Sequence, residues 1–252
     1  MVAPYSRAQR NLILASLLLV AAAGWAVLVW QSREMDAGMG ITMGMAAPLF
    51  LLIWVLMMVA MMFPTAAPMF LTFARVQASR EQRGQPFVPT WIFVAAYLGL
   101  WTLFGALAYG IAAGLEHAAQ DSMWLMDHAA RIGGVVLVLA GLYQLTPLKR
   151  ACLSHCRTPT TFVLTSWRDG AAGAIRMGLE HGLYCLGCCW LLFAILFPLG
   201  LMNVAAMALI TLLIFAEKSL AMGTRVAVLA ALVLVVYGAV VVAMPAALPT
   251  MM

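Results

Sequence analysis

Three thiols and an imidazole lie close together in segment 180–190, which reads Glu-His-Gly-Leu-Tyr-Cys-Leu-Gly-Cys-Cys-Trp. Successive residues of an α-helix turn by about 100°, so a helix here places all four donors on one face. Thiolates and imidazoles bind soft metal ions, and paired thiols also exchange electrons. Cysteine is equally a small apolar residue that packs well inside membrane helices. The density of donors favours a metal site, and its predicted ligands are His181, Cys185, Cys188 and Cys189.

A second set of soft donors lies in segment 54–64, Trp-Val-Leu-Met-Met-Val-Ala-Met-Met-Phe-Pro. Its methionines form two pairs spaced four residues apart, which stacks their thioethers on adjoining faces of a helix. A thioether is neutral, so a membrane helix carries it without the desolvation cost of a charged ligand, and it binds Cu(I). Methionine is also an adaptable core filler, and 19 methionines make some clustering expected. The candidate ligands here are Met57, Met58, Met61 and Met62.

A third group of donors follows Pro147. If a helix restarts at this proline, Cys152 and Cys156 lie one turn apart on it, with His155 beside them. The group can be a cytoplasmic delivery site for a metal ion. It can equally be a basic interfacial turn whose thiols are incidental.

Two acidic residues, Glu180 and Glu217, lie at or inside the expected membrane boundary. Such groups usually pair with a cation or mark an ion or proton path. The neighbouring cations predict pairs of Glu180 with Arg176 and of Glu217 with Lys218. The secondary candidates for the metal site are Cys152, His155, Cys156, Glu180 and Glu217.

The elements that position these donors are predicted to be membrane-spanning helices. Of the 252 residues, 65% are hydrophobic and 9% are charged, and the mean hydropathy is +1.00. These values lie far from those of a soluble domain and predict an all-α polytopic membrane protein. We expect one transmembrane helical domain over residues 1–252 with about seven helices. The predicted helices cover residues 12–30, 48–73, 88–115, 132–148, 177–201, 203–216 and 226–244.

The basic residues predict the orientation of the helices. With the N-terminus in the cytoplasm, all of the 14 Lys and Arg residues except Arg33 and Arg131 fall on the cytoplasmic side. This asymmetry in short loops follows the positive-inside rule and places the C-terminus outside, in the periplasm. The basic residues are scattered, which argues against a nucleic-acid partner, and no nucleotide-binding motif is present. Five cysteines are too few for a disulfide framework, so we expect reduced thiols.

The two principal donor sets are predicted to lie at similar depth. At about 1.5 Å per residue, both Met57–Met62 and Cys185–Cys189 come near the middle of a hydrocarbon core about 30 Å thick. Soft donors of the second and fifth predicted helices can therefore face each other across the bundle.

Four stretches of the chain together resemble a bacterial family of uncharacterised, predicted metal-binding integral membrane proteins. They are residues 54–64, 143–159 and 182–190 and the pair Glu217-Lys218. The resemblance covers most of the chain from the second to the sixth predicted helix. It implies a multi-pass protein of the bacterial inner membrane with a metal site, and it implies neither an activity nor a ligand set.

These features favour a membrane protein that handles or translocates a soft metal ion such as Cu(I), although thiolate and imidazole also accept zinc or iron. In this hypothesis methionines of the outer segment 31–47 capture the ion, the thioethers pass it on, and the thiols hold it. The expected partners are the lipid bilayer and a copper chaperone or a membrane oxidase or oxygenase complex. The alternatives are a thiol redox subunit and a structural accessory subunit with glycines such as Gly182 and Gly187 for helix packing. No catalytic residue is predicted, which favours a protein that is not an enzyme.

Overall fold

The computed structural model describes residues 6–34, 42 and 44–248, and all regular structure in these ranges is helical. The outer methionines Met35, Met39 and Met43 lie outside the described residues. The helices are α1 (Arg7–Glu34), α2 (Ala47–Glu81), α3 (Thr90–Gln120), α4 (Met123–Tyr143), α5 (Pro147–Arg157), α6 (Pro159–Thr165), α7 (Gly170–Ala194), α8 (Leu196–Leu199), α9 (Val204–Ser219), α10 (Gly223–Ala243) and the 3₁₀ helix η1 (Pro245–Ala247).

Six helical segments in the described part of the chain are long and apolar enough to cross a membrane. They are α1, α2, α3, α4, α7 together with α8, and α10. The prediction of an all-α polytopic membrane protein is thereby confirmed. The sixth predicted span corresponds to α9, which has 16 residues. At about 1.5 Å per residue α9 is about 24 Å long, short of a hydrocarbon core about 30 Å thick.

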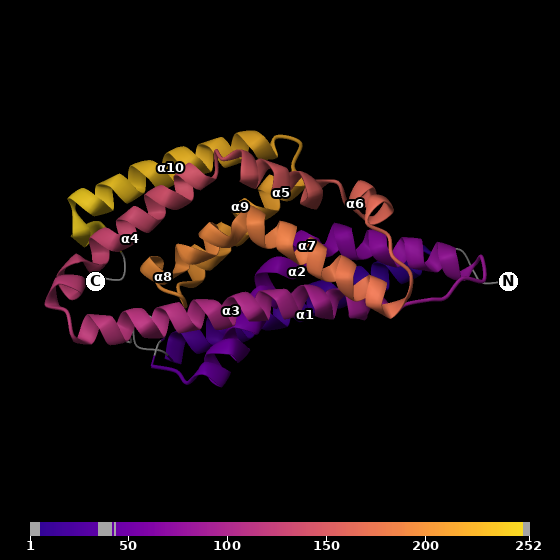
Figure 1. Ribbon diagram of the computed structural model, residues 1–252, viewed down its shortest axis with the longest axis horizontal. Helices are drawn as coiled ribbons and strands as arrows, with labels where there is room; N and C mark the ends of the chain where they lie inside the picture. Colours follow the sequence, from indigo (N-terminus) through magenta and orange to yellow (C-terminus); the bar gives the residue numbers. More distant parts are fainter. Residues whose placement is uncertain (1–5, 35–41, 43, 249–252) are drawn as a thin grey trace.

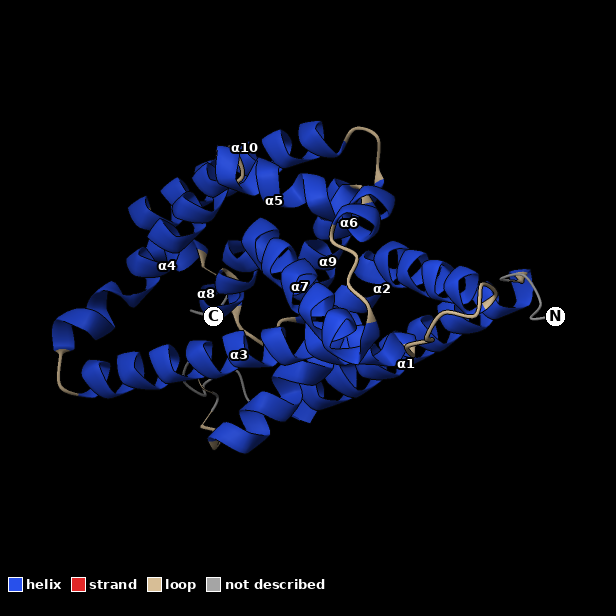
Figure 2. Ribbon diagram, turned by 45° about the vertical axis from the view of Figure 1, so that its right-hand side comes forward, coloured by secondary structure: helices blue, strands red, loops and turns tan. Residues whose placement is uncertain are grey.

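The helices lie in three groups, which are visible in Figure 1 and again after a turn of 45° in Figure 2. Helices α1, α2 and α3 pack on one another on one side, α4 and α10 pack on each other along the opposite edge, and α7 and α9 lie between α3 and α10. Small residues allow the closest of these pairings: a Cβ atom on Gly134 of α4 would lie 2.9 Å from the carbonyl oxygen of Gly238 of α10. Such close approach of backbones is typical of helices packed in membranes.

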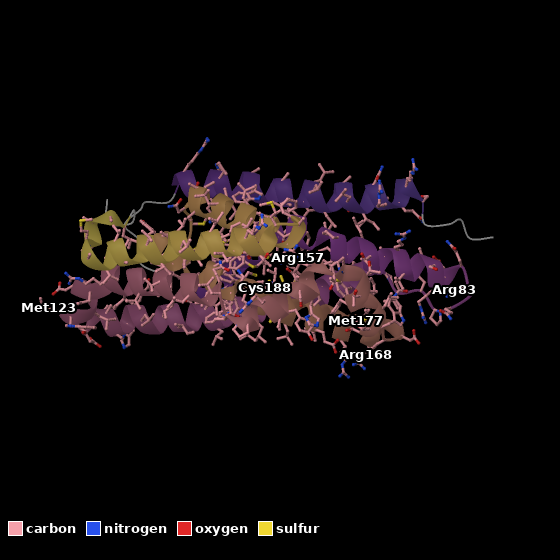
Figure 3. All side chains as sticks on the ribbon, turned by 90° about the horizontal axis from the view of Figure 1, so that it is seen from above. Arg83, Met123, Arg157, Arg168, Met177 and Cys188 are labelled. Atoms are coloured by element: carbon pink, nitrogen blue, oxygen red, sulfur yellow. The ribbon has the colours of Figure 1, made fainter. Side chains whose placement is uncertain are left out.

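The two ends of the bundle differ in charge. Figure 3 shows Arg83 and Arg168 toward one end, Met123 at the opposite end, and Cys188 in the middle region. The distribution of Lys and Arg predicts that the end with the arginines faces the cytoplasm. Cys188 therefore lies far from both ends of the molecule along its long axis.

The outer surface and the interior are both apolar. Large side chains such as Leu19, Leu103 and Leu209 are about 70% exposed, as expected of a surface that faces lipid. The interior contains stacked aromatic rings, among them Phe73 and Phe93 with ring centroids 4.8 Å apart. Of the six candidate spans, α2 is the one most enclosed by its neighbours.

Candidate metal centre

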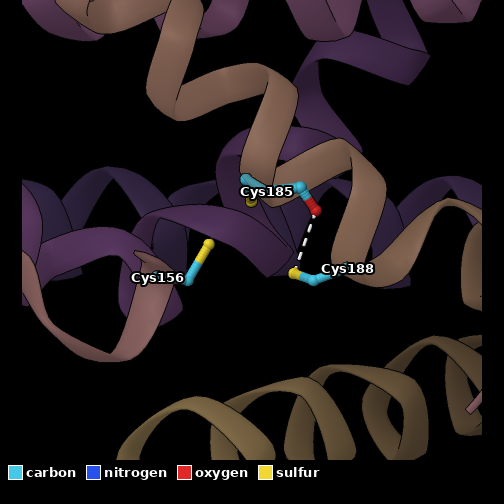
Figure 4. Close-up of side chains that lie close together, drawn as sticks. All are labelled: Cys156, Cys185 and Cys188. Carbon is cyan, nitrogen blue, oxygen red and sulfur yellow. Dashed lines mark hydrogen bonds between the residues drawn. The ribbon is translucent and has the colours of Figure 1, made fainter. Parts of the chain in front are cut away.

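Three cysteine sulfurs from two helices converge inside the bundle (Figure 4). The Sγ atoms of Cys156, Cys185 and Cys188 all lie within 4.8 Å of one another. Cys156 comes from α5, and the other two cysteines come from α7. Among the residues that the structure describes, this is the one group of three or more His, Cys, Asp or Glu side chains close enough to share a metal ion. We refer to these three residues as the trithiol cluster.

Helix α5 brings Cys156 to the cluster. It begins at Pro147, and the hydroxyl of Thr146 caps it by accepting a hydrogen bond from the backbone N–H of Lys149 at 3.2 Å, so a helix does restart at this proline and Cys152 and Cys156 lie one turn apart on it. One turn before Cys156, the side chain of Cys152 packs on α7.

Glycine at position 187 allows α5 and α7 to lie in direct contact. A Cβ atom there would be 2.6 Å from the sulfur of Cys152, which is far inside van der Waals contact. The same backbone segment is held by Tyr143, whose hydroxyl donates to the carbonyl oxygen of Gly187 at 2.5 Å. One turn away, the ring of His155 stacks on that of Tyr184 with centroids 4.0 Å apart. The α5–α7 interface therefore fixes the separation of the cysteines that the two helices carry.

The thiols of α7 bond back to their own helix. The sulfur of Cys188 donates to the carbonyl oxygen of Cys185 at 3.1 Å, and the sulfur of Cys189 donates to the same oxygen at 2.8 Å. All three cysteines are buried, which confirms that the thiol face of this helix points into the protein and away from lipid. Cys189 lies outside the trithiol cluster.

The sulfur of Cys185 also meets two polar groups from other helices. The hydroxyl of Tyr97, on α3, lies 3.1 Å from this sulfur. The ammonium group of Lys218, on α9, donates to it at 3.1 Å. Both side chains are buried. Hydrogen-bond donors of this kind stabilise a thiolate and orient it as a ligand.

The ion pairs beside the cluster differ in part from the prediction. Glu180 pairs with Arg176 at 3.1 Å, as expected. Glu217 pairs with Lys149, which lies 2.7 Å away and comes from α5, so the predicted pair of Glu217 with Lys218 is wrong. Adjacent residues of a helix point about 100° apart, and Glu217 and Lys218 therefore meet different neighbours. The side chain of Lys149 also donates to Gln144.

Arg157 fastens the end of α5 to the end of α9. Its guanidinium donates to the carbonyl oxygens of Glu217 and Leu220, each at 2.8 Å, where the last carbonyls of α9 have no partner within the helix. Since Arg157 directly follows Cys156, this contact also sets the position of the third sulfur relative to α9.

Both thiols of α5 hold their protons more tightly than a free cysteine. Burial raises the pKa of the Cys152 thiol. Hydrogen bonding to the side chains of Cys185 and Cys188, together with burial, raises the pKa of Cys156. A metal ion bound by Cys156 must therefore displace a proton, so acid weakens such binding.

His181 lies apart from the three sulfurs. Its ring is buried against the rings of Phe93, Tyr97 and Phe162, with centroids 6.0, 5.5 and 5.6 Å away. Neither ring nitrogen has a hydrogen-bond partner among the described residues. A buried polar group without a partner is costly, which leaves this imidazole available to a ligand.

The predicted thioether ligands occupy a different interface. Met57, Met58, Met61 and Met62 are each no more than 1% exposed. Their helix, α2, packs on α1, α3 and α9, whereas α7 packs mainly on α3 and α5. Pro64 and Pro68 lie inside α2, which continues through them to Glu81.

Sequence reasoning missed Tyr97 and the contact of Lys218 with sulfur, and it ranked Cys156 as secondary. A single tyrosine in an apolar span carries no signal of its own. Lys218 at the end of a predicted span was the available clue, because a buried cation needs a partner.

The fold and this centre define an all-helical, polytopic membrane protein with an internal cluster of three thiols, two of them buried and one half-buried. A family model described as "PpoB2: Copper chaperone" matches residues 51–241. The chain belongs to this family. No curated protein matches the chain, and no solved structure does.

Proposed function

We propose that this protein binds Cu(I) within the membrane at Cys156, Cys185 and Cys188 and handles the ion for delivery or translocation. One observation carries the proposal: three thiols from two helices, those of Cys185 and Cys188 buried and that of Cys156 half-buried, converge within 4.8 Å in a member of a copper chaperone family. Thiolates are soft ligands that select Cu(I), and a three-sulfur site suits this ion. The bacterial inner membrane is the location that the basic residues and the resemblance to membrane proteins support.

The other predicted donors have subordinate roles in this proposal. His181 and Cys189 lie on the same helix face as Cys185 and offer ligands one turn away or adjacent to the cluster. The thioethers of α2 provide weak, exchangeable contacts for Cu(I) on its way to or from the thiols. Cys152 and His155 lie on α5, beside Cys156. In this proposal the ion passes by these two residues to or from a partner such as a copper chaperone or a membrane oxidase complex.

The experiment is a Cu(I) titration of the detergent-purified protein under reducing conditions, in competition with a coloured Cu(I) chelator. The wild type is expected to bind one Cu(I) per cluster. The triple variant C156S/C185S/C188S is expected to lose more than about 100-fold in affinity, beyond the 10- to 100-fold typical of an outer-shell change. The single variant C152S is the matched control and is expected to retain the affinity.

Stoichiometric, tight copper in the triple variant would contradict the proposal and move the site elsewhere. A wild-type protein that binds no copper but purifies with a disulfide between two of these cysteines would instead favour the thiol redox function.

A further inference from the structure

Lys218 is a buried cation beside the proposed ligands. Its side chain lies on the last turn of α9, the residue is 8% exposed, and its ammonium is 3.1 Å from the sulfur of Cys185. Burying an ammonium group is expensive, and such groups in membrane proteins are found next to a compensating charge. The compensation must therefore be sought among the groups around Lys218.

No carboxylate among the described residues lies within 4.0 Å of the Lys218 ammonium. The adjacent Glu217 is already paired with Lys149, and these two opposite charges cancel. The positive charge of Lys218 is therefore not balanced by Glu217, and its ammonium group donates to the sulfur of Cys185. The trithiol cluster is the group positioned to balance it.

We infer that Lys218 makes the trithiol cluster selective for monovalent soft cations over divalent ones. The inference rests on the function proposed above, because it concerns the same three sulfurs. With three thiolate ligands, a complex of Cu(I) or Ag(I) carries two net negative charges, whereas a complex of Zn(II) or Cd(II) carries one. A fixed positive charge in contact with one sulfur stabilises the more negative complex to a greater degree, and the low dielectric of the interior strengthens this difference.

Tyr97 provides an internal comparison. Its hydroxyl lies 3.1 Å from the same sulfur, but it is neutral. Removing it takes away a hydrogen bond without changing the charge of the site. Its loss is therefore expected to weaken monovalent and divalent complexes alike, whereas loss of the Lys218 charge is expected to alter their ratio.

The test measures the affinities of the full-length, detergent-purified protein for Ag(I) and for Cd(II), each in competition with a chelator of known affinity. Lys218→Met is expected to lower the ratio of Ag(I) to Cd(II) affinity by at least about tenfold, since a unit charge at contact distance is worth more than this even at an effective dielectric near 20. Lys218→Arg keeps the charge and is expected to hold the ratio within about threefold of wild type. Tyr97→Phe is expected to lower both affinities and leave the ratio unchanged.

Lys218→Gln, which keeps a polar but neutral side chain, is measured in parallel in case the methionine variant does not fold. It is expected to shift the ratio in the same direction. An unchanged ratio in a folded, neutral variant would overturn the inference while leaving the copper function standing. Wild-type protein that binds Ag(I) no better than C156S/C185S/C188S would instead overturn the proposed function and the inference with it.

Discussion

The α5–α7 interface and helix α2 both concentrate sulfur, yet they surround it differently. At the α5–α7 interface, sulfurs from two helices approach within 4.8 Å, and a hydroxyl and an ammonium group contact one of them. On α2, the thioethers of Met57, Met58, Met61 and Met62 are buried in a helix that also contributes aromatic side chains such as Trp54 and Phe70 to the apolar core. The first environment can hold an anionic metal complex, and the second suits neutral ligands.

This difference shows that donor density along one helix does not define a site by itself. A thiolate complex in the membrane needs both a second helix that completes the ligand set and a cation that compensates its charge. In the proposed site, helix α5 provides the ligand from a second helix, Cys156, and the short helix α9 provides the cation, Lys218. Thioethers need no compensating cation, because they are neutral.

The largest effect is expected from a substitution that separates α5 from α7. Gly187→Val places a branched side chain where even a Cβ atom would be 2.6 Å from the sulfur of Cys152. Overpacking of this kind typically costs about 1–3 kcal/mol, and here it also displaces Cys156. We expect a lower melting temperature in detergent and at least about a tenfold loss of Cu(I) affinity.

Gly110→Val is the control for this variant, because nothing lies within 4 Å of a Cβ atom built at that position. It is expected to match wild type in both measurements. A Gly187→Val protein with wild-type copper affinity would show that the contact between α5 and α7 does not define the site.

A smaller effect is expected from replacing Met57, Met58, Met61 and Met62 of α2 with leucine. Leucine conserves the volume and the apolar character of methionine, so the structure should tolerate the change. The equilibrium affinity for Cu(I) is expected to stay within about threefold of wild type, whereas the rate of copper loading in membrane vesicles is expected to fall. A loss of affinity as large as that of C156S/C185S/C188S would place the site on α2, and an unchanged rate would remove the thioethers from the pathway.

Much of the fold could be predicted from the sequence, because apolar runs long enough to span a bilayer are rare outside membrane helices. The restart of a helix at Pro147 was also predictable, since proline is favoured in the first turn of a helix. The apolar pattern does not predict helix α6, and it predicts a full span at α9 although this helix is shorter than the hydrocarbon core. The apolar composition of α9 does not indicate where this helix begins and ends relative to the other helices.

The site was readable only within single helices. Periodicity placed Cys185 and Cys188 on one face, and their burial agrees with this. The arrival of Cys156 depends on how α5 packs against α7, and the separate partners of Glu217 and Lys218 depend on how α9 is rotated. Such contacts between distant segments are set by tertiary packing, which one sequence does not encode in any local pattern.

The most direct measurement is X-ray absorption at the copper edge of the Cu(I)-loaded protein, made on wild type and on Cys156→Ser. We expect a shell of three sulfur atoms around Cu(I) in the wild type and the loss of one sulfur in the variant. A copper shell that is unchanged by Cys156→Ser, or one made mainly of nitrogen and oxygen, would contradict a site built by α5 and α7 together.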